Sequence, residues 1–250
     1  MSNDWDFYFS NVNGSKASLF VNLGIRSSAP DPKYPHLLWT WVHFLTPRPD
    51  GLSSDKEAPT LHSIEDAIVS VVQNNLDAQY VGRITTLGRR EFYWYAPTTK
   101  NFSRIVQQAM LAFQPYKFDT GHKVDKAWSQ YLDLLYPLPE QIQSIQNRKV
   151  IEALQERGDN LQKPRPVQHW VYFKSDAPQE QFRQATEKLG YRTIRAFQRD
   201  DGQSDQPFGL VIERVDKADW QSIDAAVIEL FQLARKTGGE YDGWETAVER

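Results

Sequence analysis

The last segment of the chain carries the residue types best suited to binding a protein partner. Residues Glu240, Tyr241, Asp242, Trp244 and Glu245 combine two aromatic side chains with three carboxylates. Aromatic side chains often anchor protein interfaces, and a rim of carboxylates attracts a basic partner. In a second interpretation, the aromatic side chains close the hydrophobic core instead. We predict these five residues as the partner-binding site, and we expect Trp244 to be mostly buried while Asp242 and Glu245 stay accessible.

The histidines and other polar residues do not form a known catalytic or metal-binding pattern. His36 and His43 are an odd number of residues apart and would point to opposite faces of a regular strand. The sequence has no HExxH motif, no GxSxG turn, no phosphate-binding loop and no dinucleotide fingerprint. We therefore predict no catalytic residue, no metal site and no cofactor, and we favour a protein that is not an enzyme.

Two groups of charged residues are given structural interpretations. Adjacent helix residues do not face each other, so Glu65 and Asp66 are interpreted as favourable charge near a helix N-terminus. The basic residues Arg83, Arg89 and Arg90 lie beside glycines. They are interpreted as the solvated rim of a hairpin rather than as an anion site.

The overall charge argues against a protein that binds nucleic acid directly. The formal net charge is −3 and the isoelectric point is about 6.0, whereas phosphate neutralisation requires a basic face. Aromatic residues can stack on bases when they lie on an open sheet. The RNP1 pattern of such proteins is missing, however, and we favour packing for the candidates His169, Tyr172, Phe197 and Phe208.

Composition and the N-terminus indicate the cellular compartment. The chain has no cysteine, which suits the reducing cytoplasm, where we expect the protein. Its first residues lack the features of a signal peptide. No apolar run approaches the roughly 20 residues of a membrane helix, so we expect no membrane association.

Strands dominate the first part of the chain. Alternating apolar residues and an Asn13-Gly14 turn predict a hairpin at the N-terminus. A helix is predicted to begin after Ser63 as its N-cap. The further elements are expected at residues 36–46, 79–86, 90–96, 101–113 and 116–120, with helical material at 127–136 and 140–157. Residues 1–157 are predicted to form one α+β domain.

A second domain is predicted after a polar linker. Residues 158–166 are rich in polar residues and end in Lys163-Pro164-Arg165-Pro166. The elements that follow are a strand at 167–174, a helix at 178–189, strands at 191–199 and 208–215, a helix at 217–236 and a strand at 240–248. This βαββαβ order predicts a ferredoxin-like domain over residues 167–250. The fold class is α+β, with two α/β sandwiches.

The C-terminal third resembles the bacterial family of regulators of ribonuclease E activity B. The resemblance is carried by the strand His169-Trp170-Val171-Tyr172-Phe173, by Lys188-Leu189-Gly190-Tyr191, and by the closing helix with its GGEYDGWET segment. It implies a non-catalytic protein that binds and inhibits an RNA-degrading endonuclease.

The first part, roughly residues 1–150, resembles the bacterial family numbered 695 among the domains of unknown function. The residues that carry this resemblance are Trp5-Asp6-Phe7-Tyr8, the strand from Ala17 to Leu23, Asp50-Gly51-Leu52, Ile64-Glu65-Asp66, and Tyr80-Val81-Gly82-Arg83 with Phe92-Tyr93-Trp94-Tyr95. It implies a fold and a domain neighbour but no known chemistry.

Together these features predict a non-catalytic protein-binding regulator. The resemblance implies ribonuclease E as the partner, and RNA decay as the process that is modulated. The alternative is an uncharacterised enzyme or small-ligand-binding protein with its site at the interdomain cleft, since such clefts often hold ligands. The sequence leaves the oligomeric state open.

Overall fold

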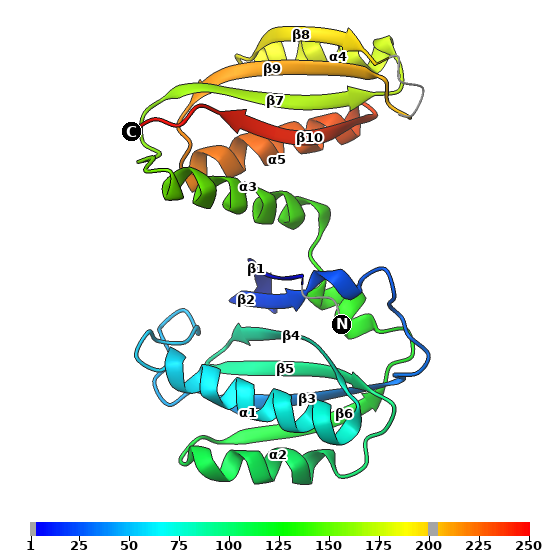
Figure 1. The fold of residues 1–250 in the computed structure, drawn as a ribbon, viewed down its shortest axis with the longest axis vertical. Coiled ribbons are helices and arrows are strands. Elements are labelled where there is room, and N and C mark those ends of the chain that lie inside the picture. Colours follow the sequence, from blue (N-terminus) through cyan, green and yellow to red (C-terminus); the bar gives the residue numbers. More distant parts are fainter. Residues whose placement is uncertain (1–3, 200–204) are drawn as a thin grey trace. The chain divides into compact units, whose positions relative to one another are not determined.

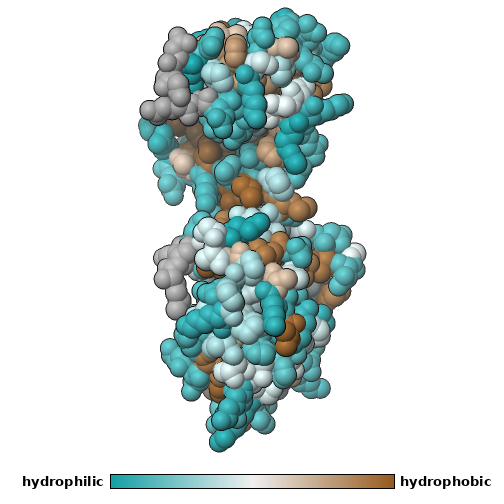
Figure 2. Space-filling view, turned by 90° about the vertical axis from the view of Figure 1, so that its right-hand side faces the viewer, coloured by the Kyte–Doolittle hydropathy of each residue, from teal (hydrophilic) through white to brown (hydrophobic). Residues whose placement is uncertain are grey.

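The computed structural model describes residues 4–199 and 205–250. The chain divides into two compact units, residues 1–137 (unit 1) and residues 138–250 (unit 2). Each unit contains an antiparallel sheet and helices (Figure 1), so the chain is an α+β protein with an N-terminal and a C-terminal domain, as predicted. On the face shown in Figure 2, hydrophilic residues cover most of the surface, and hydrophobic residues gather in smaller areas.

Unit 1 is built on a six-stranded sheet with the strand order β1-β2-β4-β5-β3-β6. All neighbouring strands in this sheet are antiparallel. The strands are β1 (Trp5–Val12), β2 (Ser15–Asn22), β3 (His36–His43), β4 (Gln79–Thr86), β5 (Arg89–Ala96) and β6 (Phe118–Val124).

Helices α1 (Ala58–Leu76) and α2 (Phe102–Met110) pack on one face of this sheet (Figure 1) and share a hydrophobic core with it. The other face is partly covered by a π-helix, Gln130–Leu135, and by the residues just before it. There Trp128 stacks on Tyr95 with ring centroids 4.1 Å apart. The unit therefore has apolar packing on both faces of its sheet. Two short 3-10 helices, Leu23–Ile25 and Leu111–Phe113, complete it.

Helix α1 begins earlier than predicted. Its N-cap is Glu57. The carboxylate of Glu57 accepts hydrogen bonds of 2.7 and 3.1 Å from the backbone N–H groups of Leu45 and Thr46. The apolar stripe of the helix already starts at Leu61, so the helix extends past Ser63, which lies inside it. The prediction of an N-cap at Ser63 is therefore wrong.

Unit 2 is built on a four-stranded antiparallel sheet with the order β10-β7-β9-β8. Its strands are β7 (Arg165–Phe173), β8 (Arg192–Gln198), β9 (Phe208–Asp216) and β10 (Gly239–Thr246). Helix α4 (Asp176–Lys188) follows β7, and helix α5 (Trp220–Lys236) follows β9. From β7 onward the elements follow the predicted βαββαβ order. Both helices pack on the face of the sheet that carries Val167, Val171 and Ile212.

Helix α3 (Pro139–Glu156) belongs to unit 2 and packs beside α5. Its residues Ile151 and Leu154 lie in the unit 2 core. The division of the chain therefore falls before α3, not after it at residue 157. The segment predicted as a linker, 158–166, is packed: Asp159 is buried and pairs with buried Arg165 at 2.9 Å. The boundary differs from the prediction because the apolar stripe of α3 must be covered, and α5 of unit 2 covers it.

No helix in the described parts of the chain is long and apolar enough to span a bilayer.

Candidate partner-binding site

Strand β10 contains a bulge that determines how the predicted site is arranged. Its pairing with β7 shifts between Tyr241 and Gly243, so Asp242 is an extra residue on β10. Residues three apart on a regular strand point to opposite faces. Because of the bulge, both Tyr241 and Trp244 instead point into the unit 2 core. Gly243 has a φ of 134°, a conformation that favours glycine.

Tyr241 is part of the core rather than of the surface. Its hydroxyl lies 2.8 Å from Nδ1 of His169, and the His169 side chain is completely buried. Burial lowers the pKa of His169 to about 3, and the nearby charge of Arg214 acts in the same direction. The imidazole is therefore neutral at physiological pH. Burial also raises the pKa of Tyr241 well above its ordinary value.

Trp244 connects β10 to two helices. Its side chain is 9% exposed, and its indole Nε1 donates a hydrogen bond of 2.9 Å to Oδ1 of Asn147 on α3. The amide of Asn147 in turn donates to Asp224 on α5 at 3.0 Å. Since Asn147 is itself buried, this chain of hydrogen bonds satisfies polar groups that would be costly to bury alone. Trp244 is thus mostly buried, as expected, and has a structural role.

The three carboxylates of the segment remain at the surface. Glu240, Asp242 and Glu245 are all exposed. Glu240 accepts a hydrogen bond of 2.9 Å from the side-chain amide of Gln206. Asp242 and Glu245 lie close to the bulge, and their exposure agrees with the accessibility expected of them.

A surface groove of about 420 Å³ lies between the bulge and α3. We call it the terminal groove. It brings together three of the five predicted residues, Asp242, Trp244 and Glu245, and excludes Tyr241 and Glu240 from its lining. Its complete lining is Gln143, Gln146, Asn147, Val150, Trp170, Tyr172, Asp242, Gly243, Trp244 and Glu245.

Sequence reasoning missed the α3 wall of the terminal groove. One signal was available, because Asn147 lies one turn before Ile151, on the apolar stripe of α3. A buried amide at such a position requires a hydrogen-bond partner. The structure supplies two partners from elements that are distant in the sequence.

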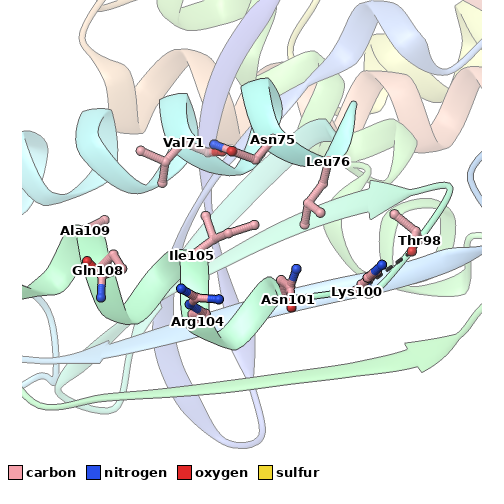
Figure 3. Close-up of a pocket in the computed structure, with 10 residues that line it drawn as sticks. All are labelled: Val71, Asn75, Leu76, Thr98, Lys100, Asn101, Arg104, Ile105, Gln108 and Ala109. Atoms are coloured by element: carbon pink, nitrogen blue, oxygen red, sulfur yellow. Dashed lines mark hydrogen bonds between the residues drawn. The ribbon is translucent and has the colours of Figure 1, made fainter.

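Unit 1 contains a second groove, of about 670 Å³, between α1 and α2. In Figure 3, Ile105 extends from α2 toward α1, and Lys100 and Arg104 lie at the start of α2. The lining combines apolar side chains with amides and two cations, and it contains no carboxylate. Its residues are Val71, Asn75, Leu76, Thr98, Lys100, Asn101, Arg104, Ile105, Gln108 and Ala109.

Three charged residues of unit 1, Glu65, Arg83 and Arg90, form a cluster beneath the surface that the sequence did not predict. Glu65 accepts a hydrogen bond from Tyr80 at 3.0 Å and pairs with Arg83 and, at 3.4 Å, with Arg90. Burial lowers the pKa of Arg90 to about 10, with the charge of Arg83 acting in the same direction. The interpretation of Glu65 as helix-end charge is therefore wrong, because Glu65 lies inside α1 and is buried. The interpretation of Arg83 and Arg90 as a solvated rim is wrong as well, because Arg90 is buried and Arg83 is largely covered where it pairs with Glu65.

The histidines of unit 1 do not assemble a metal site. His43 Nε2 lies 2.7 Å from Oδ2 of Asp119 in an exposed pair between β3 and β6. Within residues 4–199 and 205–250, no group of three or more His, Cys, Asp or Glu side chains could hold a metal ion.

Two family models match the chain, one for each unit. The model described as "Family of unknown function (DUF695)" matches residues 3–136, which is more than half of the chain. The model described as "Regulator of ribonuclease activity B" matches residues 144–246 and points to a regulator of ribonuclease activity. These matches confirm both resemblances identified in the sequence. The second match begins inside α3, in agreement with the assignment of α3 to unit 2.

Comparison with individual proteins adds little to the family matches. None of the curated proteins matches the chain. A crystal structure of an unknown protein from Galdieria sulphuraria is similar over 86% of this chain and 99% of that chain, at 9% sequence identity and a TM-score of 0.23. A similarity this low supports no argument about fold or function.

Proposed function

The chain belongs to the family of unknown function DUF695, and from the features of unit 2 we propose that it is a non-catalytic regulator that binds a ribonuclease. The match of residues 144–246 to the regulator family carries the proposal. We further propose that the partner is ribonuclease E and that binding changes the rate of RNA decay. A cytoplasmic protein fits this role, and a chain without cysteine suits that compartment.

The terminal groove is the proposed docking site. Its rim carries the exposed carboxylates of Asp242 and Glu245, and its floor includes the indole of Trp244. Ribonucleases bind RNA through basic surfaces, because phosphate contacts dominate that affinity. A basic segment of the enzyme would therefore be attracted to the acidic rim, while Val150 and Trp170 offer apolar contact. Occupation of the enzyme's basic segment would hinder its access to RNA.

Binding and cleavage assays with purified ribonuclease E test this proposal. Wild-type protein is expected to bind at micromolar concentration and to alter cleavage of a labelled RNA. The double variant Asp242→Asn/Glu245→Gln removes two rim charges with little change in volume. It should weaken binding by about fivefold or more at low salt, mainly through slower association, and less at high salt.

Matched controls separate a local effect from a general loss of charge. Glu156→Gln/Glu229→Gln removes two exposed carboxylates of α3 and α5 that do not line the terminal groove, and it should leave binding within twofold of wild type. Gln146→Arg puts a cation into the groove wall and should weaken binding while the thermal transition is unchanged. The proposal fails if ribonuclease E neither binds nor changes its cleavage rate, or if the rim and control variants behave alike.

The groove of unit 1 supports a second candidate function, the binding of a small anionic molecule. Its volume is within the range of about 300–1,000 Å³ that ligand sites occupy. Lys100 and Arg104 supply two cations with no carboxylate beside them in the lining. A thermal-shift screen of small organic phosphates and carboxylates tests this function. Stabilisation that disappears in Lys100→Gln/Arg104→Gln would support it, and a screen without any stabilising anion would remove it.

A further inference from the structure

The sheet of unit 2 has a second face, opposite α4 and α5, that carries aromatic and arginine side chains. Val167, Val171 and Phe173 of β7 point into the core. Because side chains alternate along a strand, Trp170 and Tyr172 point to the opposite face. We call this surface the outer face and define it by Trp170, Tyr172, Arg195, Phe197 and Arg199. Cross-strand pairing aligns Tyr172, Gly209 and Phe197 across β7, β9 and β8.

The aromatic rings of the outer face are held in fixed positions. The ring of Phe197 lies against the backbone of Gly209, where an added Cβ would come within 2.3 Å of the ring. Gly209 therefore makes room for the ring to lie over the middle of the sheet. Tyr172 meets Phe197 edge to face, with ring centroids 6.3 Å apart. Both residues are partly exposed, so the two rings form a platform that spans β7, β9 and β8.

Each ring of the platform is accompanied by an arginine. The guanidinium carbon of Arg195 lies 4.5 Å from the centroid of Phe197, and that of Arg199 lies 4.0 Å from the centroid of Tyr172. Arg199 also donates a hydrogen bond to the Tyr172 hydroxyl. In the described parts of the chain, neither arginine pairs with a carboxylate, whereas Arg192 on the same strand pairs with Glu213. Among the described residues, these two exposed guanidinium groups therefore have no carboxylate partner, and they can contact an anionic ligand.

We propose that the outer face binds single-stranded RNA: Arg195 and Arg199 move from the ring faces to contact phosphates, and bases stack in their place on Phe197 and Tyr172. Aromatic rings on a sheet stack on bases without regard to sequence, and arginine adds cation–π and phosphate contacts. An RNA strand supplies both a flat ring and a negative charge in every nucleotide. An acidic protein segment supplies the charge without a regular series of rings, so RNA fits the alternation of rings and guanidinium groups better.

The charge distribution limits the proposed RNA strand to one side of the β-sheet. The β8 side of the outer face carries Arg195 and Arg199, while β10 at the other edge carries Glu240, Asp242 and Glu245. Repulsion from these carboxylates would keep RNA on β8, β9 and β7. The net charge of −3 led us to expect no direct nucleic-acid binding. We also favoured packing over base stacking for Tyr172 and Phe197, because the RNP1 pattern is missing and the local charge is not basic. The proposal departs from both expectations, since stacking with two phosphate contacts requires only a local pair of cations.

Of the four aromatic residues considered for base stacking in the sequence, the structure places two in or against the core and two on the outer face. His169 is buried in the core, and Phe208 packs against that core. Tyr172 and Phe197 are on the outer face, where Trp170 joins them. Because Trp170 and Tyr172 also line the terminal groove, the variants that test RNA binding are placed at Arg195, Phe197 and Arg199. RNA binding at these residues does not depend on the proposed ribonuclease partner.

Fluorescence anisotropy with the full chain and a fluorescein-labelled oligouridylate of ten nucleotides tests the proposal. Wild-type protein in 50 mM salt is expected to bind with a dissociation constant in the micromolar range. Two phosphate contacts predict a slope of about −1.4 for log K against log salt concentration. Arg195→Gln/Arg199→Gln and, separately, Phe197→Leu should each weaken binding at least fivefold.

The controls make each outcome decisive. Arg183→Gln/Arg235→Gln removes the same charge from the helical side of unit 2 and should leave binding within twofold of wild type. A ten-base-pair RNA duplex should bind at least tenfold more weakly, since its bases cannot stack on the rings. The proposal is overturned if oligouridylate does not bind at 100 µM protein, if the outer-face and control variants bind equally, or if a labelled deca-glutamate peptide binds more tightly than RNA. Thermal melts of all variants verify that they remain folded.

Discussion

Acidification should destabilise unit 2 through His169, whose imidazole is buried and neutral in the folded protein. Its pKa is lowered to about 3 by burial, with Arg214 adding to the effect, whereas an unfolded histidine has a pKa of about 6.5. Between these values the unfolded chain binds a proton that the folded chain does not. The stabilisation is therefore complete above pH 6.5 and is lost progressively as the pH falls toward 3. At pH 5 the loss amounts to about 2 kcal/mol relative to pH 7.5.

Carboxylates also titrate in this range, so a variant must isolate the histidine. Urea unfolding at pH 7.5 and pH 5.0, followed by hydrogen exchange of β7 peptides, gives the free energy of unfolding of unit 2. His169→Gln retains a side chain that can bond to Tyr241 but cannot bind the proton. Its loss of stability between the two pH values should be smaller than that of the wild type by about 2 kcal/mol.

A second measurement does not depend on the variant. Proton NMR of the wild type should show one histidine ring that does not titrate between pH 7.5 and pH 4.5. If all five histidines titrate near pH 6.5, or if His169→Gln loses as much stability as the wild type on acidification, the assignment of His169 as a buried neutral group is refuted.

Three further predictions concern packing. Asn147→Ala leaves the indole N–H of Trp244 buried without a partner and should cost about 1–3 kcal/mol in urea unfolding, whereas Ala in place of an exposed amide of α3 should have little effect. Gly82→Ala should destabilise unit 1 strongly in a thermal melt, because Gly82 has a φ of 153° and an added Cβ would lie 2.6 Å from a carbonyl oxygen of β2; a wild-type melting temperature would contradict this. A truncated chain that begins at Leu138 should unfold cooperatively, while one that begins at Arg165 lacks α3 and should melt at a lower temperature, and equal melting temperatures would show that α3 contributes nothing to the core.

Local sequence signals predicted most of the elements. The strand expected at residues 79–86 has those bounds, and the Asn13-Gly14 turn joins β1 to β2. These features depend on side-chain alternation and turn chemistry, which the sequence shows directly. From β7 onward, the order of elements in unit 2 was likewise predicted by the alternation of strand and helix patterns.

The errors arose where a residue's partner is distant in the sequence. Glu65 was interpreted as helix-end charge, yet its partners Arg83 and Arg90 lie on strands beneath α1. Helix α3 was assigned to the first domain because it precedes a polar segment, yet its apolar stripe packs on α5. Periodicity shows that a helix has an apolar face, but it does not show which element covers that face.

The bulge in β10 explains how one short segment can combine stability with recognition. On a regular strand without a bulge, the spacing of three between Tyr241 and Trp244 would leave one of them on the outer side of the sheet. With it, both aromatic side chains enter the core, and the register of β10 resumes at Gly243. Asp242, the residue without a partner in the pairing of β10 with β7, carries a carboxylate at the surface, and with Glu245 it lines the terminal groove. Substitution of the aromatic residues should therefore change the free energy of unfolding, whereas substitution of the carboxylates should change binding alone. A segment in which both kinds of variant altered stability equally would contradict this division.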